Sequence, residues 1–207
     1  MARWQLAARA RNDFADLIDG LTQDQLGRPT LCEAWTTKDV LAHLVSFVET
    51  GALGFMGGLI GSGFDFDKFS QRMVAKRIDR PADELSATLR DRATTSAPLP
   101  GFPEGLTVSD VAIHTQDVRR PLGLAGSLDD EVLRHTLDFL TTAKQATTLV
   151  DRPDLDDLAL RATDIDWSYG SGEEINGPAE SILMALANRP VLGELAGAGV
   201  ERWRQAG

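Results

Sequence analysis

The chain has 207 residues, of which 43% are hydrophobic and 25% charged, and its net charge is −10. This balance is typical of a globular protein, and no apolar run reaches the roughly 20 residues of a membrane span. The acidic charge argues against nucleic acid as a partner, and the single cysteine, Cys32, excludes an intramolecular disulfide and a multi-cysteine zinc site.

The first half of the chain predicts two long helices and a glycine-rich segment. Apolar residues recur at helical spacing over residues 3–21, which indicates an amphipathic helix. The next helix is predicted to begin after Thr36, because Asp39 stands three residues later in a capping-box pattern, and His43 falls inside its apolar stretch. Six glycines over residues 51–63 then indicate close helix packing or a mobile loop.

Three further helices are expected before residue 150. Pro81 begins a short helix that continues through about residue 93. Another helix is expected to run from about residue 106 to the Arg119-Arg120 pair, which favours a helix C-terminus, before Pro121. Leucine spacing predicts a fifth helix over residues 128–148.

After residue 150 the pattern changes. Residues 158–169 alternate in the manner of a strand, a Gly-Ser-Gly turn follows, and Pro178 marks a helix start. We therefore expect a mainly α protein, with a helical domain in residues 1–149 and a small α+β C-terminal region in residues 150–207.

Asp110 and His114 are four residues apart on a predicted helix, which places both side chains on one face about 5 to 6 Å apart at Cβ. This spacing suits two ligands of one divalent ion, and His43 on another helix can supply the third. Three protein ligands and an open position are typical of a catalytic zinc. The alternative is that each histidine is an isolated, hydrogen-bonded residue.

Three other residues have more than one interpretation. Asp117, three residues past His114, can accept the second ring N–H of a metal-bound histidine, reach the ion itself, or be a simple exposed acid. Cys32 has no basic neighbour and is predicted to be a small buried hydrophobe rather than a nucleophile. His135 is expected to be solvated. Serine-hydrolase and nucleotide-binding motifs are absent from the sequence.

Two sequence blocks carry a resemblance to a known family. Residues 31–44 read Leu-Cys-Glu-Ala-Trp-Thr-Thr-Lys-Asp-Val-Leu-Ala-His-Leu, and residues 111–123 contain His114, Asp117 and the Arg-Arg-Pro step. They resemble the mycothiol-dependent maleylpyruvate isomerase family of the DinB-like superfamily, and residues 177–189 resemble its small C-terminal region.

The resemblance implies a DinB-like four-helix bundle that binds one divalent metal, with zinc expected. It implies His43 and His114 as ligands, and Asp110 as the third in place of the family's commoner glutamate. It implies mycothiol as the thiol cosubstrate, and the family's active-site arginine falls on Arg189.

We therefore expect a metal-dependent enzyme that uses a low-molecular-weight thiol for isomerisation or thiol transfer on a small electrophile, whose carboxylate Arg189 or Arg120 can hold. The alternative is a non-catalytic metal-binding or small-ligand-binding bundle, and a weaker one is a structural or dimerising bundle without metal. The N-terminal segment lacks the apolar region of a signal peptide, so we expect a cytoplasmic protein, with a homodimer as a candidate assembly.

Overall fold

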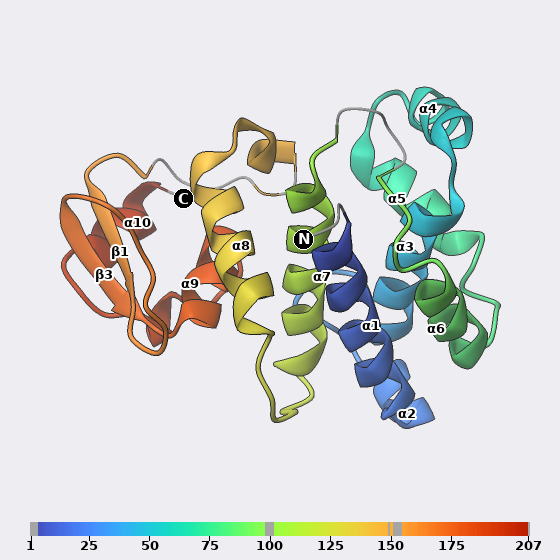
Figure 1. Ribbon diagram of the computed structural model, residues 1–207, viewed down its shortest axis with the longest axis horizontal. Coiled ribbons are helices and arrows are strands. Elements are labelled where there is room, and N and C mark those ends of the chain that lie inside the picture. Colours follow the sequence, from blue (N-terminus) through green and yellow to red (C-terminus); the bar gives the residue numbers. More distant parts are fainter. Residues whose placement is uncertain (1–3, 98–101, 149, 151–154, 207) are drawn as a thin grey trace. The chain divides into compact units, whose positions relative to one another are not determined.

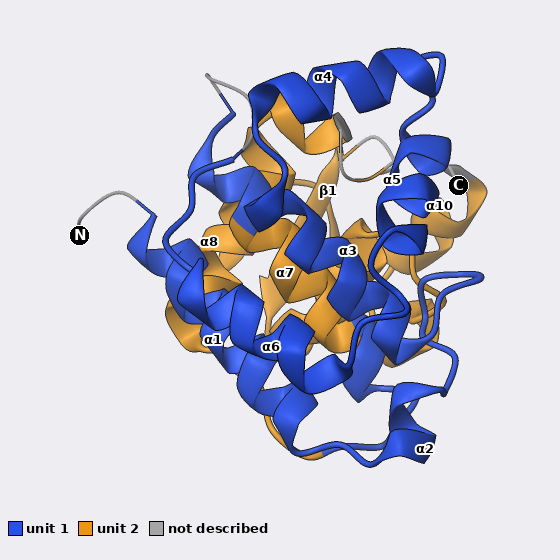
Figure 2. Cartoon of the chain, turned by 90° about the vertical axis from the view of Figure 1, so that its right-hand side faces the viewer, with its two compact units in different colours: residues 1–107, 117–124 blue, residues 108–116, 125–207 orange. Residues whose placement is uncertain are grey.

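The computed structural model describes residues 4–97, 102–148, 150 and 155–206, and the chain forms two compact units (Figure 2). One unit comprises residues 1–107 and 117–124, and the other comprises residues 108–116 and 125–207. A domain boundary at residue 150 stays a prediction of the sequence.

The first unit is helical, and α6 packs against both α1 and α3 within it. Figure 1 labels its helices: α1 (Gln5–Asp19), α2 (Gln23–Leu26), α3 (Thr37–Glu49), α4 (Ala52–Gly61), α5 (Phe66–Ala75) and α6 (Ala82–Asp91). Helix α7 (Glu104–Arg119) contributes residues to both units. It begins two residues earlier than predicted, and the Glu104 carboxylate accepts a hydrogen bond from the Ala7 backbone N–H at 3.2 Å.

The predicted capping box at the start of α3 is confirmed. The Thr36 hydroxyl accepts a hydrogen bond from the Asp39 backbone N–H at 3.3 Å, and the Asp39 carboxylate accepts one from the Thr36 backbone N–H at 2.8 Å. These two bonds satisfy backbone donors that the first turn leaves without helical partners. They fix the residue at which α3 begins, and therefore the face on which His43 lies.

The glycine-rich segment forms α4 and a turn into α5. Phe55 is buried and packs edge-on against Phe69 of α5, with ring centroids 4.9 Å apart. A Cβ atom at Gly58 would lie 2.6 Å from the Phe69 ring, so this glycine is required for the two helices to approach. Close packing, one of the two alternatives that the sequence left open, is therefore what Gly58 provides.

A partly buried ion-pair network ties the end of α3 to the segment after α5. The Glu49 carboxylate accepts hydrogen bonds from Arg77 Nε at 2.8 Å and from Arg80 Nη1 at 2.9 Å, and its side chain is 24% exposed. Burial raises the pKa of Glu49, but the hydrogen bonds from Arg80 and Arg77 outweigh it and hold the pKa below its usual 4.5. The carboxylate is therefore charged in the folded protein at neutral pH.

We expect Glu49→Gln to lower the free energy of unfolding at pH 7 by about 2 kcal/mol, because it removes the charge that pairs two partly buried guanidinium groups. The folded pKa lies below the unfolded one, so this stabilisation is present above about pH 4.5 and is lost as pH falls through the folded pKa. Urea unfolding of both proteins at pH 7 and in acid measures the difference, which should shrink in acid.

The control for Glu49→Gln is Asp24→Asn. The Arg28–Asp24 pair is also a carboxylate–guanidinium contact, at 2.9 Å, but its side chains are 61% and 75% exposed. Exposed pairs contribute at most about 1 kcal/mol. Equal losses in the two variants would contradict a special role for the Glu49 network.

The second unit combines helices with a small sheet. Its elements are α8 (Asp130–Thr142), a 3-10 turn (Lys144–Thr148), β1 (Leu158–Ala162), β2 (Ser168–Gly170), β3 (Glu173–Gly177), α9 (Ala179–Leu186), a 3-10 turn (Leu192–Glu194) and α10 (Gly199–Ala206). The strand order is β2-β1-β3, with β2 antiparallel and β3 parallel to β1. This mainly helical fold with a small sheet near its C-terminal end confirms the predicted fold class.

The predicted fifth helix is too long by about six residues. Helix α8 ends at Thr142 because Ala143 is extended, with φ −84° and ψ 131°. The hydroxyls of Thr141 and Thr142 bond back to the carbonyls of Leu137 and Asp138, at 2.7 and 2.6 Å, which favours the end of a helix.

The single strand predicted over residues 158–169 is wrong. The segment forms a hairpin, in which Leu160 of β1 pairs with Tyr169 of β2. Between the strands, the Asp164 carboxylate accepts a hydrogen bond from the Ala179 backbone N–H at 2.8 Å and so caps the start of α9. Position 172 requires glycine for two reasons: its φ is +139°, and a Cβ atom there would lie 2.0 Å from the Asp157 carbonyl oxygen.

None of the helices in the described part of the chain is long and apolar enough to cross a membrane.

Candidate metal centre

His43 lies in the middle of α3 and is held among aromatic rings. Its side chain is 3% exposed. Its ring centroid is 4.6 Å from that of Trp35 and 5.0 Å from that of Phe47, and the Phe47 contact is edge-on at 80°. Such contacts restrict the rotation of the imidazole and keep water from most of its surface. Helix α3 therefore supplies a histidine that is fixed before any ligand binds.

The loop before α3 brings Trp35 and Cys32 to the beginning of that helix. Thr30 donates its backbone N–H to the Trp35 carbonyl at 3.0 Å. Ala34 adopts a φ of +65°, which is unusual for a residue with a side chain and sharpens the turn. The Leu31 backbone N–H donates to the Asp117 carbonyl of α7 at 3.1 Å. This bond ties the loop to the C-terminal half of α7.

Asp110 and His114 face the same side of α7, as their spacing predicts. The His114 Nε2 and Asp110 Oδ1 atoms are 3.6 Å apart, and the side chains are 9% and 19% exposed. This separation is too long for a hydrogen bond. It matches the edge of about 3.4 Å between two ligand atoms on a tetrahedral ion with bonds of about 2.1 Å. The pair therefore fits two ligands of one small cation.

The ligand atoms of His43, Asp110 and His114 all lie within 4.8 Å of one another. The structure thus brings together the three residues that the sequence identified. A second group with the same property consists of Cys32, His114 and Asp117. His114 belongs to both groups, so it is the residue on which the site depends most.

Cys32 and Asp117 are placed differently from what the sequence predicted. Cys32 is half-exposed rather than a buried hydrophobe. Asp117 is fully buried, which excludes a simple exposed acid. The signal that could have placed Cys32 near the site is its position three residues before Trp35, whose ring contacts His43.

His135 is not solvated as predicted. It is half-buried on α8, and its Nε2 atom is buried without a hydrogen-bond partner among the described residues. It does not belong to either candidate ligand group.

Arg189, the predicted substrate-binding arginine, follows α9 in a tight turn. Its backbone N–H donates to the Met184 carbonyl at 2.9 Å, and its Nη1 atom donates to the Ala187 carbonyl at 3.1 Å. Asn188 before it adopts a φ of +56°, a conformation that asparagine tolerates better than most residues. The half-buried guanidinium is thus supported by the backbone that ends α9.

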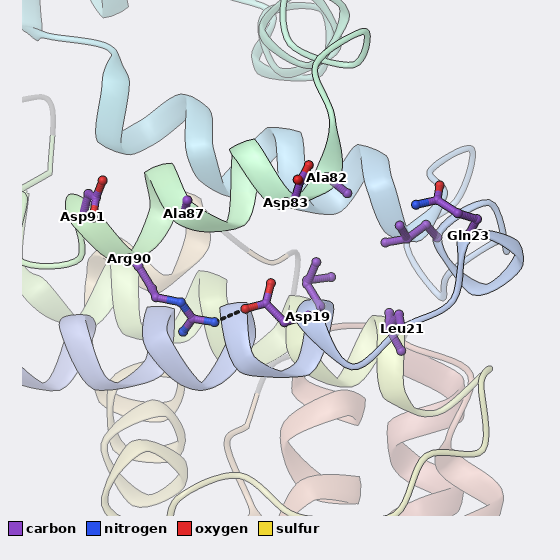
Figure 3. Close-up of a pocket in the computed structure, with 10 residues that line it drawn as sticks. Asp19, Leu21, Gln23, Ala82, Asp83, Ala87, Arg90 and Asp91 are labelled. Carbon is purple, nitrogen blue, oxygen red and sulfur yellow. Dashed lines mark hydrogen bonds and ion pairs between the residues drawn. The ribbon is translucent and has the colours of Figure 1, made fainter.

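A separate pocket of 460 Å³ lies between α1 and α6 in the first unit, and none of the candidate ligands lines it (Figure 3). Arg90 forms an ion pair with Asp19 across it, as the dashed line in Figure 3 shows. Burial raises the pKa of Asp19, but hydrogen bonds from Ser86 and Arg90 outweigh it and lower the pKa. The two charged groups that face each other here neutralise one another.

A family model described as the mycothiol maleylpyruvate isomerase N-terminal domain matches residues 7–119. Two uncharacterized proteins from strains of Mycobacterium tuberculosis are each 30% identical over 131 residues, which is 60% of this chain and 69% of theirs.

Two solved structures share the fold. Crystal structures of the mycothiol-dependent maleylpyruvate isomerase and of its histidine-to-alanine mutant align with 95% of this chain and 91% of theirs, at 17% identity and TM-scores of 0.62 and 0.61. The family match contains His43, Asp110 and His114 and spans more than half of the chain. The chain therefore belongs to the mycothiol maleylpyruvate isomerase N-terminal domain family.

Proposed function

We propose that the protein is a metal-dependent enzyme that uses mycothiol, or a closely similar low-molecular-weight thiol, for isomerisation or thiol transfer on a small electrophile. The observation that carries the proposal is the group formed by His43, Asp110 and His114, whose ligand atoms lie within 4.8 Å of one another. Family membership supports the choice of thiol and reaction class.

The donor set fits a divalent metal, with zinc preferred. Two imidazoles and one carboxylate are ligands that zinc commonly takes, and three protein ligands leave a position for an exogenous molecule. The 3.6 Å separation of the Asp110 and His114 atoms is compatible with a shared ion. A metal in this position would lower the pKa of a coordinated thiol and favour its nucleophilic thiolate form.

The protein side chains then have distinct tasks. His43 is held by the rings of Trp35 and Phe47, so it needs little reorganisation to bind an ion. Asp110 supplies a negative charge that offsets part of the charge of the cation. Asp117 is buried beside His114. Its proposed task is to orient that ring by accepting the second N–H, the arrangement common to metal-binding histidines.

Arg189 is proposed to bind a carboxylate of the electrophilic substrate. Its planar guanidinium can form two parallel hydrogen bonds with a carboxylate, and the turn after α9 restricts its backbone. Arg120, at the C-terminal end of α7, is the second candidate for this role. A cytoplasmic location stays a prediction of the sequence.

Two measurements separate this proposal from its alternatives. Elemental analysis of protein purified without a histidine tag should give about one divalent ion per chain. A structural bundle without metal would contain none and take up none on dialysis against zinc, nickel or cobalt. Turnover of maleylpyruvate that requires added mycothiol would support the enzyme, whereas metal binding without thiol-dependent turnover of any tested electrophile would favour the non-catalytic metal-binding bundle.

For Arg189→Ala we expect kcat/KM for a carboxylate substrate to fall by about 10- to 100-fold, mainly through KM, while metal content is unchanged. The loss follows from removing a charge-assisted hydrogen bond to the substrate. Arg189→Lys should recover part of the activity, because lysine keeps the charge but not the planar pair of donors. Steady-state kinetics with maleylpyruvate and mycothiol measure both variants.

The matched control is Arg161→Ala on β1, which removes a guanidinium that is 50% exposed and paired with Glu174. It should leave the kinetics unchanged. Parent-like kinetics in Arg189→Ala, with the melting temperature preserved, would move the carboxylate-binding role to Arg120.

A further inference from the structure

Helix α4, labelled in Figure 1, and the segment that leads from it into α5 expose an unusual set of apolar side chains. Leu53 is 92% exposed, Ile60 58% and Phe64 68%, and Met56 and Phe66 are exposed as well. These five residues, the α4 patch, are all of the exposed large hydrophobic residues found in the described part of the chain. They come from one stretch of the sequence, so the exposure is concentrated rather than scattered.

The packing of the chain itself does not explain the α4 patch. The inner side of α4 is already packed against α5, because Phe55 is buried against Phe69 and Gly58 allows that contact. Leu53, Met56 and Ile60 lie on the outer side of the same helix.

Gly57 lies between Leu53 and Ile60 along this outer side, and a Cβ atom there would meet nothing within 4 Å. A glycine inside a helix is destabilising relative to alanine, and the neighbouring packing gives no reason for it. A glycine on an exposed helix face does allow the backbone of another helix to approach closely, and the larger side chains beside it then interlock.

The backbone after α4 presents an aromatic ring to solvent. Phe64 has a φ of +62°, a conformation that is strained for a bulky residue, and its N–H donates to the Leu59 carbonyl at 2.9 Å. This conformation costs free energy and leaves the Phe64 ring in water. Burial of the ring against a partner would offset that cost.

We propose that the α4 patch is the contact surface between two copies of this chain, with α4 packed against α4 of the second copy about a two-fold axis near Gly57. The patch exposes roughly 500 Å² of apolar surface, so two copies bury roughly 1,000 Å² together, the size at which specific interfaces begin. Residues 51–64 carry no charge, so the contact avoids repulsion between chains of net charge −10.

A second copy fits the patch better than a lipid surface does. Asp65 and Asp67 flank Phe66 at one end of the patch, and the whole chain is acidic, which disfavours an anionic membrane. An uncharged apolar surface can face a second copy of itself across a two-fold axis, as an isologous interface requires. This assembly is independent of the proposed activity.

Sedimentation equilibrium of the full chain over a range of concentrations tests the proposal. The parent should reach twice the mass of one chain, and Leu53→Glu and Ile60→Glu should each weaken dimerisation by at least 100-fold, because a charge in the middle of the contact would be buried unpaired. Ala125→Glu adds the same charge in an exposed loop and should leave the dimer intact. Circular dichroism checks that all variants are folded.

Disulfide crosslinking complements the loss of dimerisation in the glutamate variants, because here a dimer produces a positive signal. In a Cys32→Ser background, Gly57→Cys should form a disulfide-linked dimer on mild oxidation, because the two-fold axis places the two thiols together, and Ala125→Cys should not. A parent that is monomeric at all concentrations, or a dimer unchanged by both glutamates, would overturn the proposal. If the parent is monomeric and co-sediments with phosphatidylcholine vesicles, and Leu53→Glu and Ile60→Glu abolish that binding, the patch is a lipid-binding surface.

Discussion

The His114→Ala variant is expected to lose metal binding, with zinc affinity at neutral pH lowered by well over 100-fold. His114 is the residue shared by both candidate ligand groups, so neither group of three ligands found among the described residues remains when it is removed. Loss of a direct ligand should exceed the 10- to 100-fold typical of residues that only orient ligands. Competition with a chromophoric zinc chelator measures the affinity.

The control for His114→Ala is His135→Ala on α8, which removes the third histidine of the chain from outside both ligand groups. It should bind zinc as tightly as the parent. Both variants should keep the helical circular dichroism spectrum, since each changes one side chain. Zinc binding by His114→Ala within threefold of the parent would exclude both ligand groups.

Substitutions of Asp110 should have the second largest effect, and their pattern distinguishes a ligand from a structural acid. Asp110→Ala removes the carboxylate and should lower zinc affinity by more than 100-fold. Asp110→Glu should remain metal-competent, because a longer carboxylate on the same helix face can still reach the ion. Asp110→Asn keeps the shape but not the charge and should fall between them. Titration calorimetry measures the series.

Asp117→Asn provides the comparison for the Asp110 series. If Asp117 orients His114, its loss should reduce affinity by about 10- to 100-fold, less than the loss of Asp110. If Asp110→Ala instead binds zinc like the parent and Asp117→Asn does not, the carboxylate ligand is Asp117, and the group of Cys32, His114 and Asp117 is the metal centre.

Much of the helical framework was predictable because local signals and tertiary packing agree. The Thr36–Asp39 capping box fixed the start of α3. The four-residue spacing of Asp110 and His114 determined that they share a face of α7. Such features depend on residues within one or two turns, which a single sequence displays directly.

Other features depend on contacts that the sequence does not display. Helix α4 is apolar on all sides and rich in glycine, so its periodicity gave no helix signal, and its inner side is defined by Phe69 in the next helix. The hairpin of β1 and β2 was missed because the turn between the strands, residues 163–167, contains no glycine or proline to interrupt the alternation.

Within the site, Cys32 was misjudged for the same reason. Its neighbours in sequence contain no base, whereas the structure places its sulfur within 4.8 Å of ligand atoms of His114 and Asp117. A loop that bonds to α7 through Leu31 makes this contact, and no local pattern predicts such a bond.

The most direct test of the proposed function is titration of the cobalt-loaded protein with mycothiol, followed by near-ultraviolet absorption. The Cys32→Ser background is used, because Cys32 lies close enough to the site to contribute a sulfur signal itself. We predict a saturable sulfur-to-cobalt charge-transfer band that reaches its maximum at one thiol per bound cobalt. Protein that binds no cobalt, or that binds cobalt but gives no such band at saturating mycothiol, would contradict a thiol-activating metal centre at His43, Asp110 and His114.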